Sequence, residues 1–237
     1  MSEWQFLVTL NEHLRPLKDP VAIQDVAVRL LGEHLHASRV TYAHIEGDEF
    51  VVSRSHPDGV PPLADRASLT RYGKAIVDAC RRGETVAVDD VNTDPRFTDA
   101  ERDQLVAGRI AAFVGAPLIK GGQWLAVFGV HSATPRTWTR DQIALVEVTA
   151  ERTWGAGERA RAEETLGRSD SRQAFLRRLN DTIRPLADPA RILQGTCRLL
   201  GTHLRVNRVA YGEVEGDDCV IVPVSYTHLT LPTILRV

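Results

Sequence analysis

The sequence has few cysteines, and their arrangement excludes two common kinds of small scaffold. Its three cysteines are far apart and form no Cys-x-x-Cys pair, which argues against a disulfide framework and against a zinc ribbon. Cys80 lies in an apolar helical pattern, so we interpret it as a small core residue rather than a reactive thiol. The eight histidines show no spacing typical of a metal site, and no metal centre is expected.

The chain also lacks a basic excess and a long apolar run. Its formal charge is -2, which leaves no surplus of cations to neutralise phosphates, so nucleic acid is not an expected partner. No segment approaches the roughly 20 apolar residues that a membrane span needs. The polar N-terminus, residues 1–5, does not have the basic and then apolar pattern of a signal peptide. A cytoplasmic location is therefore the default expectation.

What the sequence does contain is an internal repeat of domain length. Residues 6–52 recur, without insertion or deletion, as residues 175–221, and both copies include Arg-Pro-Leu, Asp-Pro and Glu-Gly-Asp in the same places. A repeat of this length indicates a duplicated domain rather than a solenoid unit. A second full copy would extend far beyond Val237, so we expect this sequence to hold only the beginning of one.

Residues 224–237 differ in composition from the rest of the chain. They contain no alanine, glycine, aspartate or glutamate, and their similarity to the first copy has ended. The segment is similar to the translation of a transposase sequencing adapter. We interpret it as a non-native tail that begins after Pro223, and a native strand rich in Thr and Leu is the alternative.

The first ninety residues predict two helices, a β-hairpin, a third helix and a short strand. Asp19 and Pro20 have the character of an N-cap and a first helical residue, and apolar residues follow at helical spacing. Glu46-Gly47-Asp48 predicts a turn between two strands of alternating polarity. The expected elements are a helix over residues 6–14, a helix from Pro20, strands over residues 39–45 and 50–54, a helix over residues 69–82 and a strand over residues 85–88.

The rest of the first module predicts a second hairpin between two capped helices. Each helix begins at a capping box, in which a threonine is followed three residues later by Glu or Gln. Strands that pair as hairpins favour an α+β class with an antiparallel sheet. The expected elements are a helix over residues 98–107, strands over residues 110–119 and 124–131, and a long polar helix from residue 139 to about residue 166.

Three segments carry a family resemblance: Val86–Arg96, Gly115–Gly122 and Val130–Thr139. In this order they resemble a GAF domain of the subtype found in bacterial sensor histidine kinases and, more distantly, in phytochromes. The resemblance covers most of residues 1–165, and residues 150–163 look like the exit helix of such sensors. It implies a central antiparallel sheet with helices on both faces and a ligand pocket on the face opposite the terminal helices.

The resemblance implies sensing rather than catalysis. We expect residues 1–165 to be a complete GAF sensor domain, with its exit helix from about residue 139, and residues 172–223 to be the beginning of a second, truncated copy. The implied protein is the N-terminal part of a two-component sensor histidine kinase. Alternative outputs are a cyclic-di-nucleotide enzyme or a transcription regulator. The chain itself contains no phosphoacceptor helix or glycine-rich ATP-binding box, so it is not expected to be an enzyme.

Six residues are candidates for the pocket of an unknown small-molecule ligand. Those at the end of the first hairpin would be charge-assisted donors to an anion, and the others would complete a ring around the ligand together with Arg71 and Asp89. The alternative interpretation of each polar candidate is an ordinary strand end or loop residue. The candidates are Arg54, His56, Tyr72, Asp90, Phe113 and His131.

His131 also raises the possibility of a bilin cofactor. It ends a strand four residues before Pro135, and so resembles the first histidine of the phytochrome chromophore pocket. The sequence departs from that pattern because Val130 replaces a cysteine, Ser132 follows the histidine, and the Asp-Ile-Pro segment is missing. A bilin photoreceptor is therefore kept as an alternative that is not favoured, and the cofactor is left open.

The exit helix carries a rough heptad stripe of small residues. Such a seam can pair two helices, which together with the resemblance implies a homodimer through the terminal helices. Gly155 and Gly157 each cost about 1 kcal/mol relative to alanine, so the helix would be a weak coiled coil and the alternative is a simple spacer. The stripe consists of Ile143, Val146, Ala150, Thr153, Gly157 and Ala160.

Overall fold

The chain forms two compact units, Met1–Glu164 and Thr165–Val237, which we call unit 1 and unit 2 and describe separately. The computed structural model describes residues 2–215 and 218–227, with side chains described for residues 2–212. Within this described part, no helix has both the length and the apolar character needed to cross a membrane.

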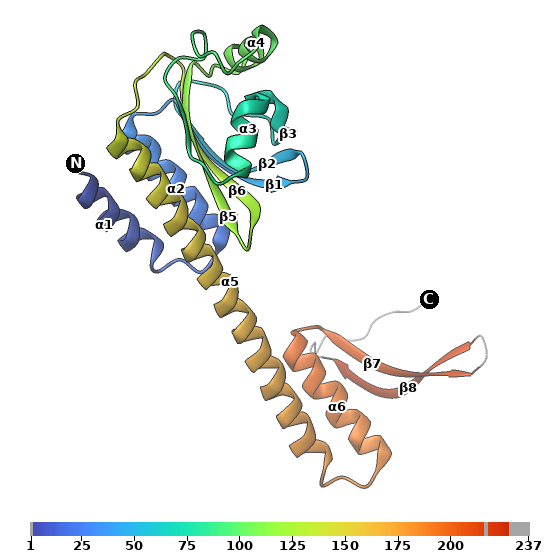
Figure 1. The fold of residues 1–237 in the computed structure, drawn as a ribbon. Helices are drawn as coiled ribbons and strands as arrows, with labels where there is room; N and C mark the ends of the chain where they lie inside the picture. The colour runs from blue at the N-terminus through green and yellow to red at the C-terminus, as the bar shows by residue number, and fades with distance from the viewer. Residues whose placement is uncertain (1, 216–217, 228–237) are drawn as a thin grey trace. The chain divides into compact units, whose positions relative to one another are not determined.

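A six-stranded antiparallel sheet lies at the centre of unit 1 (Figure 1). Its strands are β1 (Arg39–Glu46), β2 (Glu49–Pro57), β3 (Arg66–Ser68), β4 (Val86–Val88), β5 (Ala112–Lys120) and β6 (Gln123–Ser132). The order β3-β2-β1-β6-β5-β4 shows that the hairpins β1–β2 and β5–β6 meet along β1 and β6. The predicted antiparallel α+β class is confirmed.

Three helices cover one face of this sheet (Figure 1). They are α1 (Glu3–Leu14), α2 (Pro20–Leu35) and the first part of α5 (Arg140–Ile183). Phe6, Leu31 and Val146, one from each helix, are buried in a single cluster with Phe128 of β6. Asp19 accepts a hydrogen bond from the amide of the second helical residue of α2, which confirms its predicted role as N-cap.

The opposite face is covered by shorter elements: the 3-10 helix η1 (Leu69–Tyr72), α3 (Lys74–Arg81) and α4 (Asp99–Ala107). Ile76, Leu105 and Phe113 are buried between these elements and the sheet. The predicted capping box at the start of α4 is present, with both of its hydrogen bonds formed. Helices therefore cover both faces of the sheet, as expected.

The helix expected over residues 69–82 is interrupted in the structure, so that prediction is wrong. Residues 66–68 pair with β2 as an edge strand, and a single 3-10 turn precedes α3. Gly73 separates the two helical segments and has a φ of +80°, a conformation that glycine adopts easily but that an α-helix does not contain. Apolar residues recur at helical spacing through both segments, so the sequence pattern gave no sign of the break at Gly73.

The small-residue stripe on α5 lies inside unit 1. Val146, Ala150 and Ala160 are 0%, 1% and 1% exposed, because this face of the helix packs against the core of the same unit. The expectation that the stripe forms a seam between two copies is therefore wrong. The helix also continues to Ile183 instead of ending near residue 166, while its predicted capping box at Thr139 is confirmed.

Unit 2 contains the end of α5, then α6 (Pro189–Leu204) and the hairpin of β7 (Arg208–Glu215) and β8 (Asp218–Thr227). Its local structure matches that of the corresponding residues in unit 1. Asp188 caps α6 as Asp19 caps α2, and the ring of Phe175 stacks on His203 as Phe6 stacks on His34. Of the proposed tail, residues 224–227 belong to β8, and residues 228–237 lie outside the described part.

The burial of the α5 stripe predicts different accessibilities for two cysteines placed on the same helix. The variant Ala150→Cys should resist a thiol-labelling reagent in the native state and should form no disulfide between copies, because position 150 is 1% exposed. Val148→Cys, at a position that is 36% exposed, should be labelled quickly. Mass spectrometry relative to the wild-type chain measures both; rapid labelling or cross-linking at position 150 would contradict the packing.

Candidate functional site

A small cavity lies in unit 1 between the sheet and its cover of η1 and α3. Its volume is about 60 Å³. Most of its wall is apolar, with aliphatic and aromatic side chains from both the strands and the cover. Its wall includes Phe50, Tyr72, Phe113, Gly115, Trp124 and His131.

Tyr72 and His131 form a hydrogen-bonded pair in the wall of this cavity. The hydroxyl of Tyr72 lies 3.1 Å from Nε2 of His131, and the tyrosine ring makes edge contacts with Phe50 and Phe113. Burial raises the pKa of Tyr72 to about 12. Burial and, to a smaller extent, the charges of Arg39 and Arg71 lower the pKa of His131 to about 3. The imidazole is therefore neutral at physiological pH.

Arg39 is a buried cation at the start of β1, directly opposite His131 in the pairing with β6. Its side chain is 1% exposed. Its guanidinium donates to the carbonyl of Pro61, at 3.1 Å from Nε, and to the carbonyl of Gly108, at 3.2 Å from Nη2. Arg39 thus connects the loop after β2 and the end of α4 to the sheet.

Arg71 of η1 and Arg39 both lie next to Gly108, at the end of α4. A Cβ built on Gly108 would lie 2.5 Å from Nη2 of Arg71, so the guanidinium packs against that glycine. Burial is the main cause that lowers the pKa of Arg39, and the charge of Arg71 adds to it. No carboxylate of the described residues forms an ion pair with either group. The charges of both arginines act on His131, although neither arginine lines the cavity.

Arg39 was not among the residues predicted from the sequence. A signal was present, because Arg39, Thr41 and Ala43 alternate along one face of β1 and the last two line the cavity. Arg39 therefore places a charge on the same face of β1 as two residues that line the cavity. Without the pairing of β1 and β6, the face to which this series belongs could not be assigned.

Three of the six predicted pocket residues line the cavity, namely Tyr72, Phe113 and His131. Arg54 and His56 do not, and the prediction that they line it is wrong. Arg54 forms an ion pair with Asp25 of α2 at 2.9 Å, and His56 packs against Gly32 of the same helix. Both side chains therefore lie on the face of the sheet that α1, α2 and α5 cover.

A β-bulge explains this error. In the pairing of β1 and β2, Tyr42 is opposite Arg54 whereas Ala43 is opposite Val52, so Ser53 is an additional residue. An additional residue shifts the alternation of the strand by one position. Val52, which precedes the bulge, lines the cavity. Arg54 and His56, at every second position after it, contact α2 instead.

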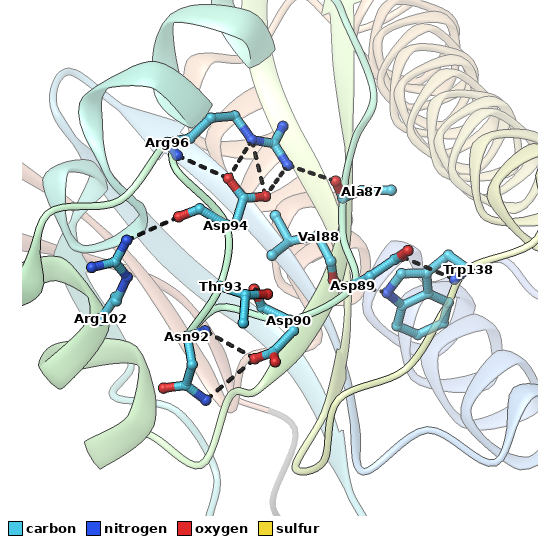
Figure 2. A network of polar contacts seen from close by, with 10 residues as sticks. All are labelled: Ala87, Val88, Asp89, Asp90, Asn92, Thr93, Asp94, Arg96, Arg102 and Trp138. Atoms are coloured by element: carbon cyan, nitrogen blue, oxygen red, sulfur yellow. Dashed lines mark hydrogen bonds and ion pairs between the residues drawn. The ribbon is translucent and has the colours of Figure 1, made fainter.

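Asp90 also lies away from the cavity wall, in a loop that holds its own shape (Figure 2). One oxygen of Asp90 accepts hydrogen bonds from the backbone and side-chain nitrogens of Asn92 at 2.9 and 3.2 Å, an arrangement typical of an Asx turn. Asp90 is therefore not one of the residues that line the cavity. Its carboxylate shapes the loop.

The rest of this loop, which connects β4 to α4, is held by a second set of contacts (Figure 2). Asp94 and Arg96 form an ion pair that lowers the pKa of the Asp94 carboxyl, and Arg102 donates to the carbonyl of Asp94 at 3.1 Å. Trp138 donates from Nε1 to the carbonyl of Val88 at 3.1 Å. The segment before α5 is thereby attached to β4.

The cavity offers little for a metal or for thiol chemistry. Within residues 2–215 and 218–227, no group of three or more His, Cys, Asp or Glu side chains could hold a metal ion. Cys80 lines the cavity, but burial raises the pKa of its thiol to about 11. A protonated thiol in an apolar wall is a poor nucleophile.

Comparison with known proteins shows the fold and the family. The model of the GAF domain family matches residues 19–156. The structure is similar to the blue-light absorbing form of the Thermosynechococcus elongatus PixJ GAF domain, with a TM-score of 0.54 and 21% identity over 65% of this chain and 93% of that one. No curated protein sequence matches the chain.

Two further similar structures have different functions. Free methionine-R-sulfoxide reductase from Neisseria meningitidis, in complex with its substrate, has a TM-score of 0.56 and 18% identity over 68% of this chain and 91% of that one. The bacteriophytochrome RpBphP3 from R. palustris has a TM-score of 0.64 and 14% identity over 96% of this chain and 51% of that one. At these identities the likeness shows the shared fold alone.

The low pKa of His131 predicts how stability depends on pH. Between its usual value of 6.5 and its native value of about 3, the unfolded chain binds a proton that the native state does not bind. The free energy of unfolding should therefore fall as the pH decreases from 6.5, by up to about 1.4 kcal/mol per pH unit. Urea titrations of the wild-type chain and of His131→Gln measure this contribution. The variant should show a shallower profile, and parallel profiles would refute the assignment.

Proposed function

Because the chain belongs to the GAF domain family, we propose that unit 1 is a sensory module that binds a small molecule in the cavity lined by Tyr72 and His131. The observation that carries this proposal is the position of the cavity. It lies on the face opposite α1, α2 and α5, and Nδ1 of His131, a residue of its wall, is buried without a hydrogen-bond partner among the described residues. A ligand bound there can shift the module between two states if its affinity for them differs.

A bilin is a less favoured ligand, although one similar structure is a blue-light absorbing GAF domain. Pockets for drug-sized molecules have volumes of about 300 to 1,000 Å³, whereas this cavity measures about 60 Å³. A tetrapyrrole would have to displace the whole cover of η1 and α3. Co-expression with a bilin pathway, followed by a visible absorption spectrum, separates this alternative from the main proposal.

A reductase function is not proposed, although one similar structure is a methionine-R-sulfoxide reductase. A thiol relay needs accessible cysteines of low pKa. In unit 1 the sequence contains only Cys80, which is buried, and burial raises its pKa to about 11. This cysteine fits a packing role.

We further propose that unit 2 is the beginning of a second GAF domain and that both belong to the sensory region of a cytoplasmic histidine kinase. The sequence repeat, the shared helix caps and the likeness to RpBphP3 over 96% of this chain support a tandem arrangement. The kinase output rests on the resemblance noted above. A homodimer through the terminal helices stays a prediction, and any such interface must use residues outside the buried stripe of α5.

Gly115 offers a direct test of the cavity as the ligand site. A Cβ at this position meets no atom of the described residues within 4 Å, so Gly115→Leu should fill the cavity while Gly115→Ala leaves room. In a thermal-shift screen of the full chain against small metabolites, a ligand at 100 times its Kd should stabilise the wild type and Gly115→Ala by about 2.7 kcal/mol. Gly115→Leu should lose this effect; equal stabilisation of all three proteins would place the ligand elsewhere.

The proposed absence of catalysis is tested with labelled ATP. Because the sequence lacks the kinase motifs, the chain should stay unlabelled after incubation with γ-labelled ATP and magnesium, while a complete histidine kinase in a parallel reaction becomes labelled. Autophosphorylation of this chain would overturn the proposal.

A further inference from the structure

The wall of the cavity carries no charge at physiological pH. Among the described residues that line it there is no Asp, Glu, Lys or Arg. Burial raises the pKa of Tyr72 to about 12 and that of Cys80 to about 11, and it lowers the pKa of His131 to about 3, so all three side chains are neutral. Arg39 and Arg71 act on His131 from outside the wall. A charged ligand would therefore lose its hydration here without gaining an ion pair.

The polar side chains of the wall already have partners, with one exception. The Thr41 hydroxyl donates to a carbonyl of β6 at 3.5 Å, and Nε1 of Trp124 donates to another carbonyl of β6 at 2.9 Å. The hydroxyl of Tyr72 is paired with Nε2 of His131. In the part of the wall that the structure describes, Nδ1 of His131 is the one side-chain nitrogen or oxygen without a partner. A ligand with several polar groups would leave most of them unsatisfied, which costs free energy in a buried site.

A single carbonyl or hydroxyl group on the ligand matches this exception. When the Tyr72 hydroxyl donates to Nε2 of His131, the proton of the neutral imidazole is on Nδ1, which can then donate to a carbonyl oxygen. In the other tautomer Nδ1 accepts, and a hydroxyl can donate to it. The wall thus suits at most one polar group, and that group need not be charged.

The rest of the wall favours an apolar body. Phe50, Val52, Leu63, Ile76 and Phe113 line the cavity with hydrocarbon. Apolar surface of a ligand that leaves water for such a wall stabilises the complex in proportion to its area. Binding in this cavity therefore depends mainly on the hydrocarbon part of the ligand.

The volume limits the ligand to a few heavy atoms. The cavity measures about 60 Å³, which holds on the order of four water-sized groups. An engineered apolar cavity that binds benzene measures roughly 150 Å³. The ligand should therefore be smaller than an aromatic ring.

We propose that the ligand of this cavity is an uncharged molecule of about three to five heavy atoms, with an apolar body and no more than one polar group, of the class of short ketones and alcohols. This inference rests on the proposed function of unit 1 as a small-molecule sensor and adds the chemical class of the ligand. Tyr72 and Ile76 of the cover and Phe113 of the sheet all line the cavity, so such a molecule contacts both layers and its binding acts on the packing between them.

The test compares acetone, acetamide and acetate, which share one planar shape and differ in polarity and charge. NMR of the full chain at constant ionic strength follows the methyl groups of Val52 and Ile76 in the wall and of Ile23, buried in the core on the other face of the sheet. Acetone should shift Val52 and Ile76 along a saturable curve and leave Ile23 unchanged. Acetamide should bind more weakly because its amide donors find no free acceptor, and acetate at least about tenfold more weakly than acetone because its charge stays unpaired.

A matched pair of leucine substitutions locates the binding. Gly115→Leu should fill the cavity and abolish the shifts that acetone causes. Gly167→Leu places the same side chain at an exposed position of α5 where a Cβ meets no atom within 4 Å, and acetone should bind to it as to the wild type. Unchanged methyl shifts of Ile23 in both variants report that the fold is kept.

The outcomes separate this inference from the function on which it rests. Acetate binding at the wall as strongly as acetone, or no shift of Val52 and Ile76 with acetone, would overturn the assignment of an uncharged ligand. If charged compounds still bind in a manner that Gly115→Leu abolishes, the cavity is a ligand site and only that assignment fails. If neither these compounds nor the metabolites of the thermal-shift screen act in a manner that depends on Gly115→Leu, both fail. The comparison on the wild-type chain needs no variant to fold.

Discussion

The antiparallel pairing of β1 with β6 is the contact on which the rest of unit 1 depends. It joins two hairpins that are far apart in the sequence into one sheet, and it gives both groups of helices a continuous surface. The same pairing places Arg39 opposite His131. The core and the candidate site are therefore two consequences of one strand pairing, and a shift of register would disrupt both.

Arg39 shows how a buried charge can hold separate parts of a fold together. Its hydrogen bonds to Pro61 and Gly108 hold two loops in place, and a cation in this position is tolerated because those carbonyls partly compensate it. The compensation is incomplete, since Nη1 has no partner among the described residues.

The errors in the predicted site have a common physical origin. Arg54 and His56 were assigned to the pocket because they end the first hairpin, but an additional residue at Ser53 places their side chains on the face that α2 covers. The stripe on α5 looked like a seam between copies because small residues at heptad spacing suit any close helix contact. Its partner is the core of the same unit. In each case the local pattern is real, and the identity of the surface that it contacts depends on distant residues.

Local signals were sufficient for most helices and strands of unit 1, for the helix caps and for the family resemblance, but not for β3 or for the break at Gly73. Capping boxes, alternation and turn residues act within a few positions, so Thr98, Thr139 and the two hairpins were predicted correctly from the residues around them. The cavity, the burial of Arg39 and the side of the sheet reached by Arg54 were decided only by tertiary structure. Strand pairing places residue 39 opposite residue 131, contacts at Gly108 bring residues 39 and 71 to the end of α4, and the bulge decides the side reached by Arg54. No pattern within a short window carries that information.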